Sequence, residues 1–97
     1  MNVEFLVAAQ AELEDAFDYY EAQRKGLGDD FSREVYLAIQ RILRHPLAWT
    51  TLSKLTRRCR TKRFPYGIVY QVRRDRILIV AVMHLKRRPD YWKDRLT

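Results

Sequence analysis

The run Ile77–Met83 holds seven consecutive apolar residues and restricts the possible folds of this chain more than any other stretch. Seven residues is an ordinary strand length, and a strand without polar side chains must be covered on both faces. The run ends at His84. It follows Arg63–Tyr70 after a break that contains Arg74 and Asp75. The two stretches therefore predict an antiparallel hairpin near the centre of a sheet.

The first half of the chain predicts two helices from the spacing of its apolar residues. The apolar stripes are Leu13, Ala16, Phe17 and Tyr20 in the first helix and Phe31, Val35, Ala38, Ile39 and Ile42 in the second. We expect Gly26 and Gly28 to end the first helix and Pro46 to end the second. Asp29 and Asp30 suit the start of the second helix, because carboxylates interact favourably with the positive end of the helix dipole there. So short a connection predicts an antiparallel helical hairpin.

Two further strands complete the expected order. Asn2–Val7 predicts a first strand, and Arg57–Phe64 predicts a charged edge strand after a loop over residues 46–56. The predicted class is α+β, a single domain over residues 1–97 with the order β-α-α-β-β-β. In this fold a helical hairpin packs on one face of a mostly antiparallel sheet, and a short C-terminal tail or helix follows.

The C-terminal half carries the positive charge. Residues 1–50 hold nine acidic and five basic side chains, a net −4, whereas residues 51–97 hold three acidic and fourteen basic, a net +11. Alternation in the predicted edge strand places Arg58, Arg60 and Lys62 on one face. We therefore expect the exposed face of the sheet to be basic. Such a face attracts an anionic partner, either a nucleic acid or an acidic protein segment.

A basic and aromatic stretch, Lys86–Trp92, follows His84. Asp90–Leu96 is expected to form one terminal helical turn that packs Tyr91 and Trp92 back on the sheet. A metal-free ribonuclease would need cations to stabilise a pentacovalent phosphorane and a His or Tyr to transfer protons. The catalytic candidates are His84, Arg88 and Tyr91. The candidates for binding nucleic acid or another target are Arg58, Arg60, Lys62, Arg63, Lys86, Arg87 and Arg88. Two alternative interpretations stay open. The basic face could serve only to neutralise an acidic partner, and His84, Tyr91 and Trp92 could serve only in packing.

Several classes of site are not expected from the composition. No glycine-rich phosphate loop occurs, and His45, His84 and Cys59 do not have a recognised metal-ligand spacing, so no metal and no cofactor are predicted. Cys59 is the only cysteine, which fits a reducing cytosol and an incidental thiol in a strand. No apolar run approaches the roughly 20 residues that cross a bilayer, and no signal peptide is recognisable. We expect a cytoplasmic protein.

The order and spacing of five stretches resemble the RelE/ParE superfamily of toxins from bacterial type II toxin–antitoxin systems, also called plasmid-stabilisation proteins. The stretches are Ala11–Glu21, Leu27–Phe31, Arg63–Tyr70, Ile79–His84 and Arg88–Trp92. The resemblance covers nearly the whole chain. It implies a small β-α-α-β-β-β fold and a cognate antitoxin that wraps the toxin and neutralises it in a hetero-oligomer. We expect an acidic, amphipathic antitoxin segment over the helices or the sheet edge.

The two branches of this superfamily imply different targets. RelE-like members cleave mRNA on the ribosome with basic residues of the sheet and a C-terminal tyrosine, whereas ParE-like members poison DNA gyrase. Gly67 and Leu85 occupy positions where many of the ribonucleases have arginine, although Tyr91 can match their tyrosine. The resemblance therefore favours the ParE-like branch, a growth-inhibiting toxin that acts on gyrase. The alternatives are a ribosome-dependent mRNA endoribonuclease and an inert antitoxin-binding module.

Overall fold

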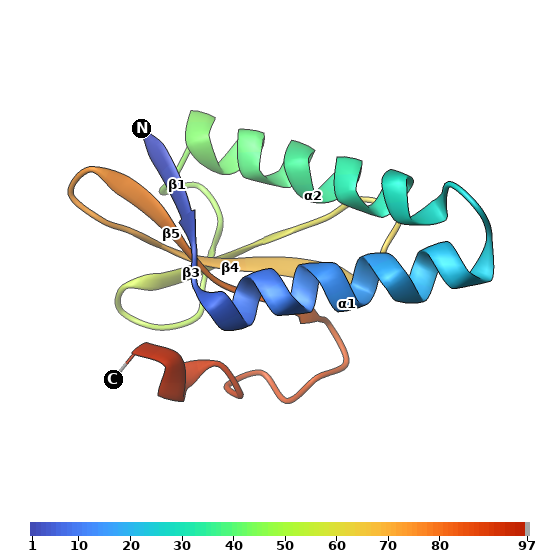
Figure 1. The fold of residues 1–97 in the computed structure, drawn as a ribbon. Coiled ribbons are helices and arrows are strands. Elements are labelled where there is room, and N and C mark those ends of the chain that lie inside the picture. Colours follow the sequence, from blue (N-terminus) through green and yellow to red (C-terminus); the bar gives the residue numbers. More distant parts are fainter. Residues whose placement is uncertain (97) are drawn as a thin grey trace.

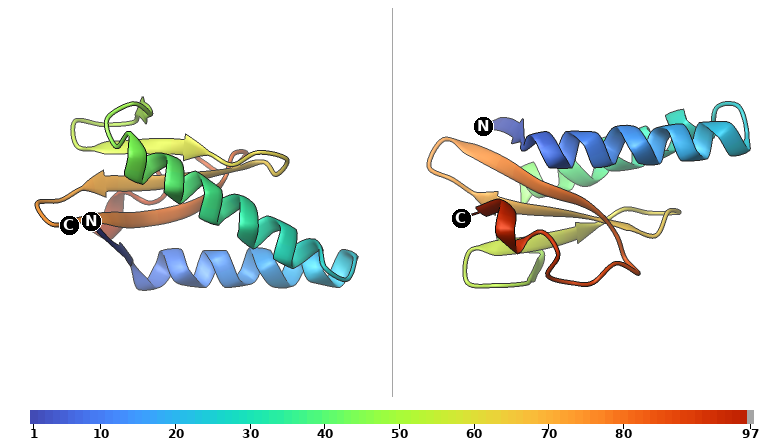
Figure 2. Two further views of the ribbon diagram at one scale, coloured as in Figure 1. Left: turned by 90° about the horizontal axis from the view of Figure 1, so that it is seen from above. Right: turned by 60° about the horizontal axis from the view of Figure 1, so that its bottom comes forward.

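The computed structural model describes residues 1–96 as two helices packed on a five-stranded sheet (Figure 1). The elements are β1 (Asn2–Phe5), α1 (Val7–Gln23), α2 (Leu27–Arg44), β2 (Thr50–Thr51), β3 (Thr56–Arg60), β4 (Tyr66–Val72), β5 (Arg76–His84) and a terminal 3-10 helix, η1 (Lys93–Leu96). The helical hairpin covers one face of the sheet, and the segment that follows β5 crosses the other face (Figure 2). The predicted α+β class and the helical hairpin are confirmed.

The sheet has the strand order β1-β5-β4-β3-β2 and mixes the two strand directions. β1 runs parallel to β5, with Asn2 opposite Arg76 and Phe5 opposite Ile79, and the other neighbours are antiparallel. The sheet contains one strand more than predicted, because Thr50 and Thr51 pair with β3 inside the segment expected to be a loop. Two exposed threonines leave no apolar alternation that a sequence pattern could detect.

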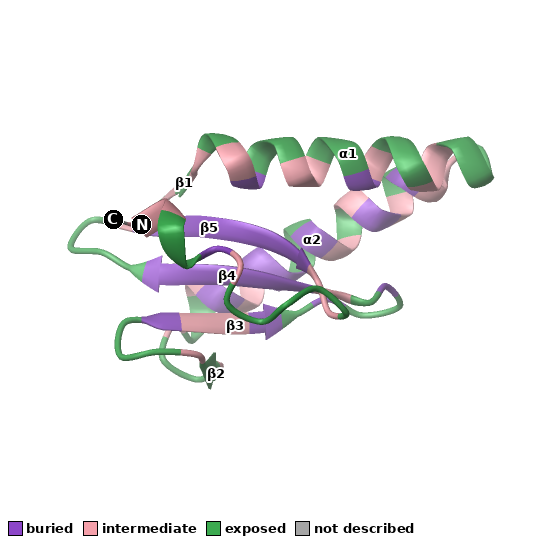
Figure 3. Cartoon of the chain, turned by 90° about the horizontal axis from the view of Figure 1, so that it is seen from below, coloured by how far each residue is buried: buried purple, intermediate pink, exposed green. Residues whose placement is uncertain are grey.

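β5 is buried on both faces, as its apolar run predicted, and β4 beside it is almost as well covered (Figure 3). The pairing of β4 and β5 shifts by one residue. Val69 lies opposite Ala81 and Tyr70 lies opposite Ile79, so that Val80 is the extra residue of a bulge. The bulge directs both Val80 and Ala81 to the face away from the helices, where they pack in the second apolar cluster.

The helical layer forms the larger apolar cluster. All five predicted stripe residues of α2 are buried, whereas only Ala16 of the α1 stripe is. Gly26 begins α2 with a φ of 90°, so the predicted glycine turn is confirmed, but Gly28 lies inside the first turn of α2. A Cβ on Gly28 would come within 2.8 Å of a backbone oxygen of α1, so glycine lets the two helices approach closely. Glu21 accepts hydrogen bonds from the N–H groups of Gly26 and Gly28, both at 2.9 Å.

The opposite face of the sheet is covered by an apolar layer in its centre, which corrects the expected open basic face. Trp92 is only 2% exposed and packs with the residues of β4 and β5 that face away from the helices, together with Tyr91 and Leu96. The predicted return of the C-terminal segment to the sheet is confirmed, and its last turn is η1.

β3 ends at Arg60, four residues before the predicted end of that strand. The hydroxyl of Thr61 donates to the carbonyl oxygen of Phe64 at 2.9 Å, and the N–H of Thr61 donates to that of Tyr66 at 3.0 Å. Arg63 has a φ of 70°, which an extended strand does not contain. Residues 61–65 therefore form a closed turn, and Lys62 and Arg63 do not continue the alternation of Arg58 and Arg60.

Candidate functional site

A hollow of about 200 Å³ opens where β5 ends, beside α1. Its lining residues are Glu12, Asp15, Ala16, Tyr19, Tyr66, Val82, His84 and Arg87. We call it the β5-end hollow. It brings His84 and Arg87, two of the residues singled out from the sequence, against the carboxylates of α1. The expected convergence of cations at His84 is therefore only partial, because the opposite wall is acidic.

His84 is half-buried and its ring is held on two sides. The N–H of Lys86 donates to Nδ1 at 3.1 Å, so Nδ1 is an acceptor and the neutral ring carries its proton on Nε2. The ring also packs edge-on against Tyr66, with 5.1 Å between the ring centroids. Burial raises the pKa of Tyr66, and the neighbouring Tyr20 raises it further. These contacts leave Nε2 as the one imidazole nitrogen that can exchange a proton with a ligand.

Tyr91 is bound to Glu12 and does not stand free at the site. Its hydroxyl donates to Oε2 of Glu12 at 2.6 Å, and the guanidinium of Arg95 donates to both oxygens of the same carboxylate at 2.8 and 3.0 Å. Burial raises the pKa of Tyr91, and so does its hydrogen bond to Glu12. The Glu12 carboxylate likewise raises the pKa of Arg95. A phenol held protonated in this way is a poor general base.

The same carboxylate closes an open edge of β5. β1 pairs with β5 only as far as Ile79, and the edge beyond that residue has no strand beside it. There the N–H of Val82 donates to Oε1 of Glu12 at 3.0 Å, and Nη1 of Arg95 donates to the carbonyl oxygen of Val80 at 3.0 Å. Buried backbone groups need such partners. Glu12 and Arg95 therefore substitute for the missing strand and attach the C-terminal segment to α1 and β5.

The remaining candidate cations fall into two separate groups. On the C-terminal segment, Arg87 lies over the ring of Tyr91 at 4.0 Å, Arg88 pairs with Asp90 at 3.3 Å, and Lys86 is exposed. The others are Arg58, Arg60, Lys62 and Arg63, which lie on β3 and the turn after it. Among these, Arg63 pairs with Asp30 of α2 at 3.5 Å.

Gly67 accommodates the side chain of Arg58. A Cβ at position 67 would lie 2.7 Å from Cδ and 2.8 Å from Cγ of Arg58, and 3.4 Å from Leu85. The stem of Arg58 thus crosses β4 at the position where the ribonuclease pattern calls for arginine. Leu85, the second position of that pattern, packs with the apolar cluster of this face. The first position is therefore filled by the aliphatic stem of Arg58 and the second by Leu85.

Sequence reasoning missed the central residue of the site, Glu12, and its partner Arg95.

Within residues 1–96, no group of three or more His, Cys, Asp and Glu side chains lies close enough together to hold a metal ion. In the same described range, no helix is long and apolar enough to cross a membrane. The only cysteine, Cys59, is buried, and its Sγ contacts the carbonyl oxygen of Ala38 at 3.8 Å.

Comparison with known proteins gives one family and a matching fold. The family described as the ParE toxin of type II toxin–antitoxin system, parDE, matches residues 3–89. The solved structure titled "Chromosomal ParDE TA system from P. aeruginosa" aligns with a TM-score of 0.65 over 89% of this chain and 97% of that chain. The alignment shows a shared fold. At a sequence identity of 14%, the roles of individual residues are not transferred from that protein to this chain. No curated protein matches the chain.

Proposed function

Because the chain belongs to the family of ParE toxins of type II toxin–antitoxin systems, we propose that it inhibits DNA gyrase and that a cognate antitoxin neutralises it. The family match over residues 3–89 supports a toxin role. The choice of target depends on the state of the residues that an RNA-cleaving toxin would use. We propose a cytoplasmic location, where both gyrase and an antitoxin would be available.

The contact between Tyr91 and Glu12 is the observation that carries the choice of gyrase over mRNA. An RNA-cleaving site needs a tyrosine or histidine free to transfer a proton, with cations around the phosphate. The hydroxyl of Tyr91 is engaged by a carboxylate at 2.6 Å, and Asp15 adds a second carboxylate to the wall of the β5-end hollow. Negative charge there opposes the approach of an RNA phosphate. Gly67 and Leu85 carry no charge themselves, and Arg58, whose stem crosses Gly67, has its Nε buried.

A ribosome-dependent mRNA endoribonuclease is the second candidate, because His84, Arg87 and Tyr66 line one hollow. In that mechanism, Nε2 of His84 would transfer the proton and Arg87 would stabilise the phosphorane. It predicts that His84→Ala removes toxicity while the fold is retained. The gyrase proposal predicts that this variant stays toxic, since the imidazole would take no part in chemistry.

For the antitoxin, we propose an acidic amphipathic segment that binds the outer face of α2. Two apolar side chains of α2 are exposed there, Tyr36 at 60% and Leu37 at 37%. They line a hollow of about 500 Å³ together with Glu34, Gln40, Arg41, Arg44 and Lys62. An apolar patch beside guanidinium groups is complementary to a helix with one apolar and one acidic face. The variant Tyr36→Ser/Leu37→Ser should lose antitoxin affinity and remain toxic.

The decisive experiment compares the two targets with one preparation of purified toxin. Gyrase supercoiling is followed on relaxed plasmid, and mRNA cleavage is followed on translating ribosomes. We expect loss of supercoiling and intact mRNA. Cleavage of mRNA at ribosomal A-site codons with normal supercoiling would refute the gyrase proposal. If neither activity is found and induced expression leaves growth unchanged, the chain is the inert antitoxin-binding module.

A further inference from the structure

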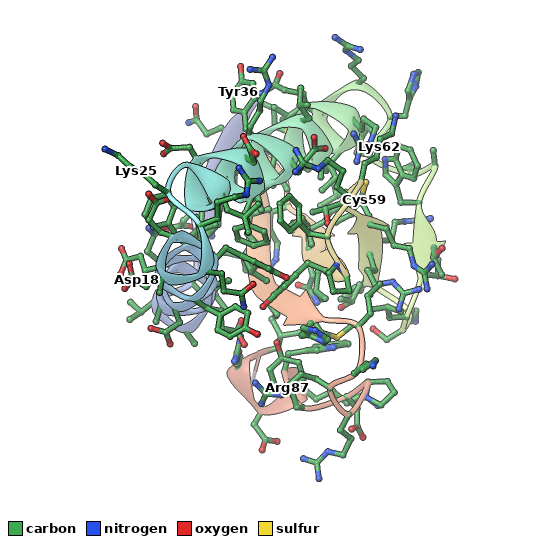
Figure 4. All side chains as sticks on the ribbon, turned by 90° about the vertical axis from the view of Figure 1, so that its right-hand side faces the viewer. Asp18, Lys25, Tyr36, Cys59, Lys62 and Arg87 are labelled. Atoms are coloured by element: carbon green, nitrogen blue, oxygen red, sulfur yellow. The ribbon has the colours of Figure 1, made fainter. Side chains whose placement is uncertain are left out.

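A basic hollow lies at the edge of the sheet opposite β1, between the last turns of α2 and the outer strands β2 and β3. It has a volume of about 420 Å³. Its lining residues are Arg41 of α2, Trp49 and Thr50 before and in β2, Arg58 and Arg60 of β3, and Thr61 and Lys62 of the following turn. We call it the arginine hollow. Figure 4 shows Lys62 at this side of the molecule, close to α2.

The positive charges of the arginine hollow have no internal counter-charge. Four of its seven lining residues are cationic, and none is a carboxylate. Arg41 donates to the carbonyl oxygen of Arg60 at 2.9 Å, which positions its guanidinium and does not neutralise it. The stem of Arg58 crosses Gly67 of β4 and its Nε is buried without a hydrogen-bond partner, so Arg41, Arg60 and Lys62 are the cations left for an anion in the hollow. No carboxylate among residues 1–96 forms an ion pair with Arg58, Arg60 or Lys62. Cations that line one hollow repel one another, so an anion bound between them is favoured.

The lining of the arginine hollow suits phosphate better than an acidic peptide. Guanidinium, ammonium and hydroxyl groups are the usual donors to phosphate oxygens, and Thr50 adds a hydroxyl at the exposed rim. Trp49 is the only apolar side chain in the lining, and its Nε1 donates to the backbone oxygen of Arg41 at 3.3 Å, which fixes the indole. An amphipathic peptide would find no further apolar surface there, whereas a base or sugar can stack on one aromatic ring.

We propose that the arginine hollow binds the sugar–phosphate backbone of a single strand of nucleic acid, with Trp49 in contact with a base or sugar. The proposal goes beyond gyrase inhibition and antitoxin binding, because it concerns the toxin alone. The binding site consists of residues of α2, β3 and the segments beside β3, and it contains no cation of the C-terminal segment. Contact with several phosphates makes the binding strongly dependent on salt.

The test measures fluorescence anisotropy of a labelled twelve-nucleotide oligothymidine at increasing salt. Three phosphate contacts, from Arg41, Arg60 and Lys62, predict a slope of log affinity against log salt of about −2, since each contact to a single strand contributes about 0.7. The variant Arg60→Gln/Lys62→Gln should lower the affinity about tenfold or more at low salt and reduce the slope by about 1.4. Binding should also quench Trp49 emission. Trp49→Phe should abolish that change, because Trp92 is buried in the other face.

The matched control is Arg33→Gln/Arg74→Gln. It removes the same charge from two exposed cations outside the arginine hollow, on α2 and in the turn between β4 and β5. This variant should keep both the affinity and the slope within about twofold of the unaltered protein. An equal loss of affinity in the control would mean that diffuse charge binds the strand, and the proposal would fail. Circular dichroism verifies the fold of each variant. If the double variant does not fold, the single Lys62→Gln variant should still reduce the slope by about 0.7.

Competition separates nucleic acid from protein as the occupant. A glutamate-rich peptide of equal charge, without the apolar face proposed for the antitoxin segment, should not displace the oligonucleotide at concentrations where unlabelled oligothymidine does. If only the peptide binds, and if its binding depends on Arg60 and Lys62, the arginine hollow is a peptide site and the proposal is wrong. The assay contains no gyrase. A toxin that binds the strand and leaves supercoiling intact would therefore contradict only the proposed function, and the opposite result would contradict only this inference.

Discussion

Replacing Glu12 with alanine should release the C-terminal segment from α1 and β5. It should also lower the free energy of unfolding substantially. The change deletes three side-chain hydrogen bonds, to Tyr91 and Arg95, and the acceptor of the Val82 N–H. Hydrogen bonds to charged groups contribute about 1.5–3 kcal/mol each, but they are not additive. The side chains of Glu12 and Arg95 are 16% and 20% exposed, so solvent screens part of their attraction. We expect a loss of about 3 kcal/mol.

A loss of this size is easy to measure in a domain of 97 residues. Total stabilities are about 5–15 kcal/mol, and each kcal/mol shifts the Tm of such a domain by about 4–8 °C. Urea unfolding followed by circular dichroism at pH 7 gives the free energy. The control is Asp15→Ala, one turn further along α1, where the side chain is exposed and makes no hydrogen bond or ion pair within residues 1–96. The control should change the stability by less than about 0.5 kcal/mol.

Two related variants separate the contributions of charge and hydrogen bonding. Glu12→Gln keeps an acceptor for the Val82 N–H and loses the negative charge, so we expect about half the loss of Glu12→Ala. A double-mutant cycle of Glu12→Ala with Tyr91→Phe should give a coupling of about 1 kcal/mol. If Glu12→Ala unfolds at the same urea concentration as the Asp15→Ala control, or if the cycle shows no coupling, the network contributes no stability and the reasoning is refuted.

Two further predictions concern glycine positions and alkaline pH. Gly28→Ala should destabilise the fold by about 1–3 kcal/mol more than Gly67→Ala. The new Cβ at position 28 would meet a backbone oxygen of α1 at 2.8 Å, whereas the one at position 67 would meet the movable side chain of Arg58. Equal losses of the free energy of unfolding in urea would contradict this. Burial raises the pKa of Tyr70 to about 12. The folded state thus keeps a proton that the unfolded chain loses near pH 10, so stability should fall as pH rises from about 10 to 12, and Tyr91 adds to the effect. Thermal melts across this range measure the decline, and Tyr70→Phe should reduce it.

Much of the fold could be predicted because its main elements have strong local patterns. The seven apolar residues of Ile77–Met83 required cover on both faces, and β5 has it. The stripe of α2 recurs at helical spacing and is buried throughout. In both elements the local pattern and the tertiary packing agree, so periodicity alone was sufficient. β2 and the turn over residues 61–65 were missed, since backbone pairing and one threonine hydroxyl define them.

The candidate site was less predictable because its central contacts join distant parts of the chain. Glu12 binds Tyr91 and Arg95, which follow it by 79 and 83 residues. By composition it resembles the other acids of α1, of which Glu14, Asp15 and Asp18 are exposed. One signal was available: Glu12 lies three residues after Ala9 and four before Ala16, on the same helix face, and both alanines are buried. A carboxylate inside a stripe of small buried residues needs a partner.

The structure also refines the argument from net charge, which located the positive charge only to residues 51–97. Four cations of that half form ion pairs with carboxylates: Arg63, Arg76, Arg88 and Arg95. Each such pair reduces the field at a distance. Arg58, Arg60 and Lys62 have no such pair among residues 1–96, and Arg41 of the otherwise acidic half joins them. The attraction for polyanions should therefore be strongest at the arginine hollow and weaker at the C-terminal segment, where Arg88 is paired. Replacing Lys86 and Arg88 with glutamine should consequently lower oligothymidine affinity less than the Arg60→Gln/Lys62→Gln variant does, although both remove two charges.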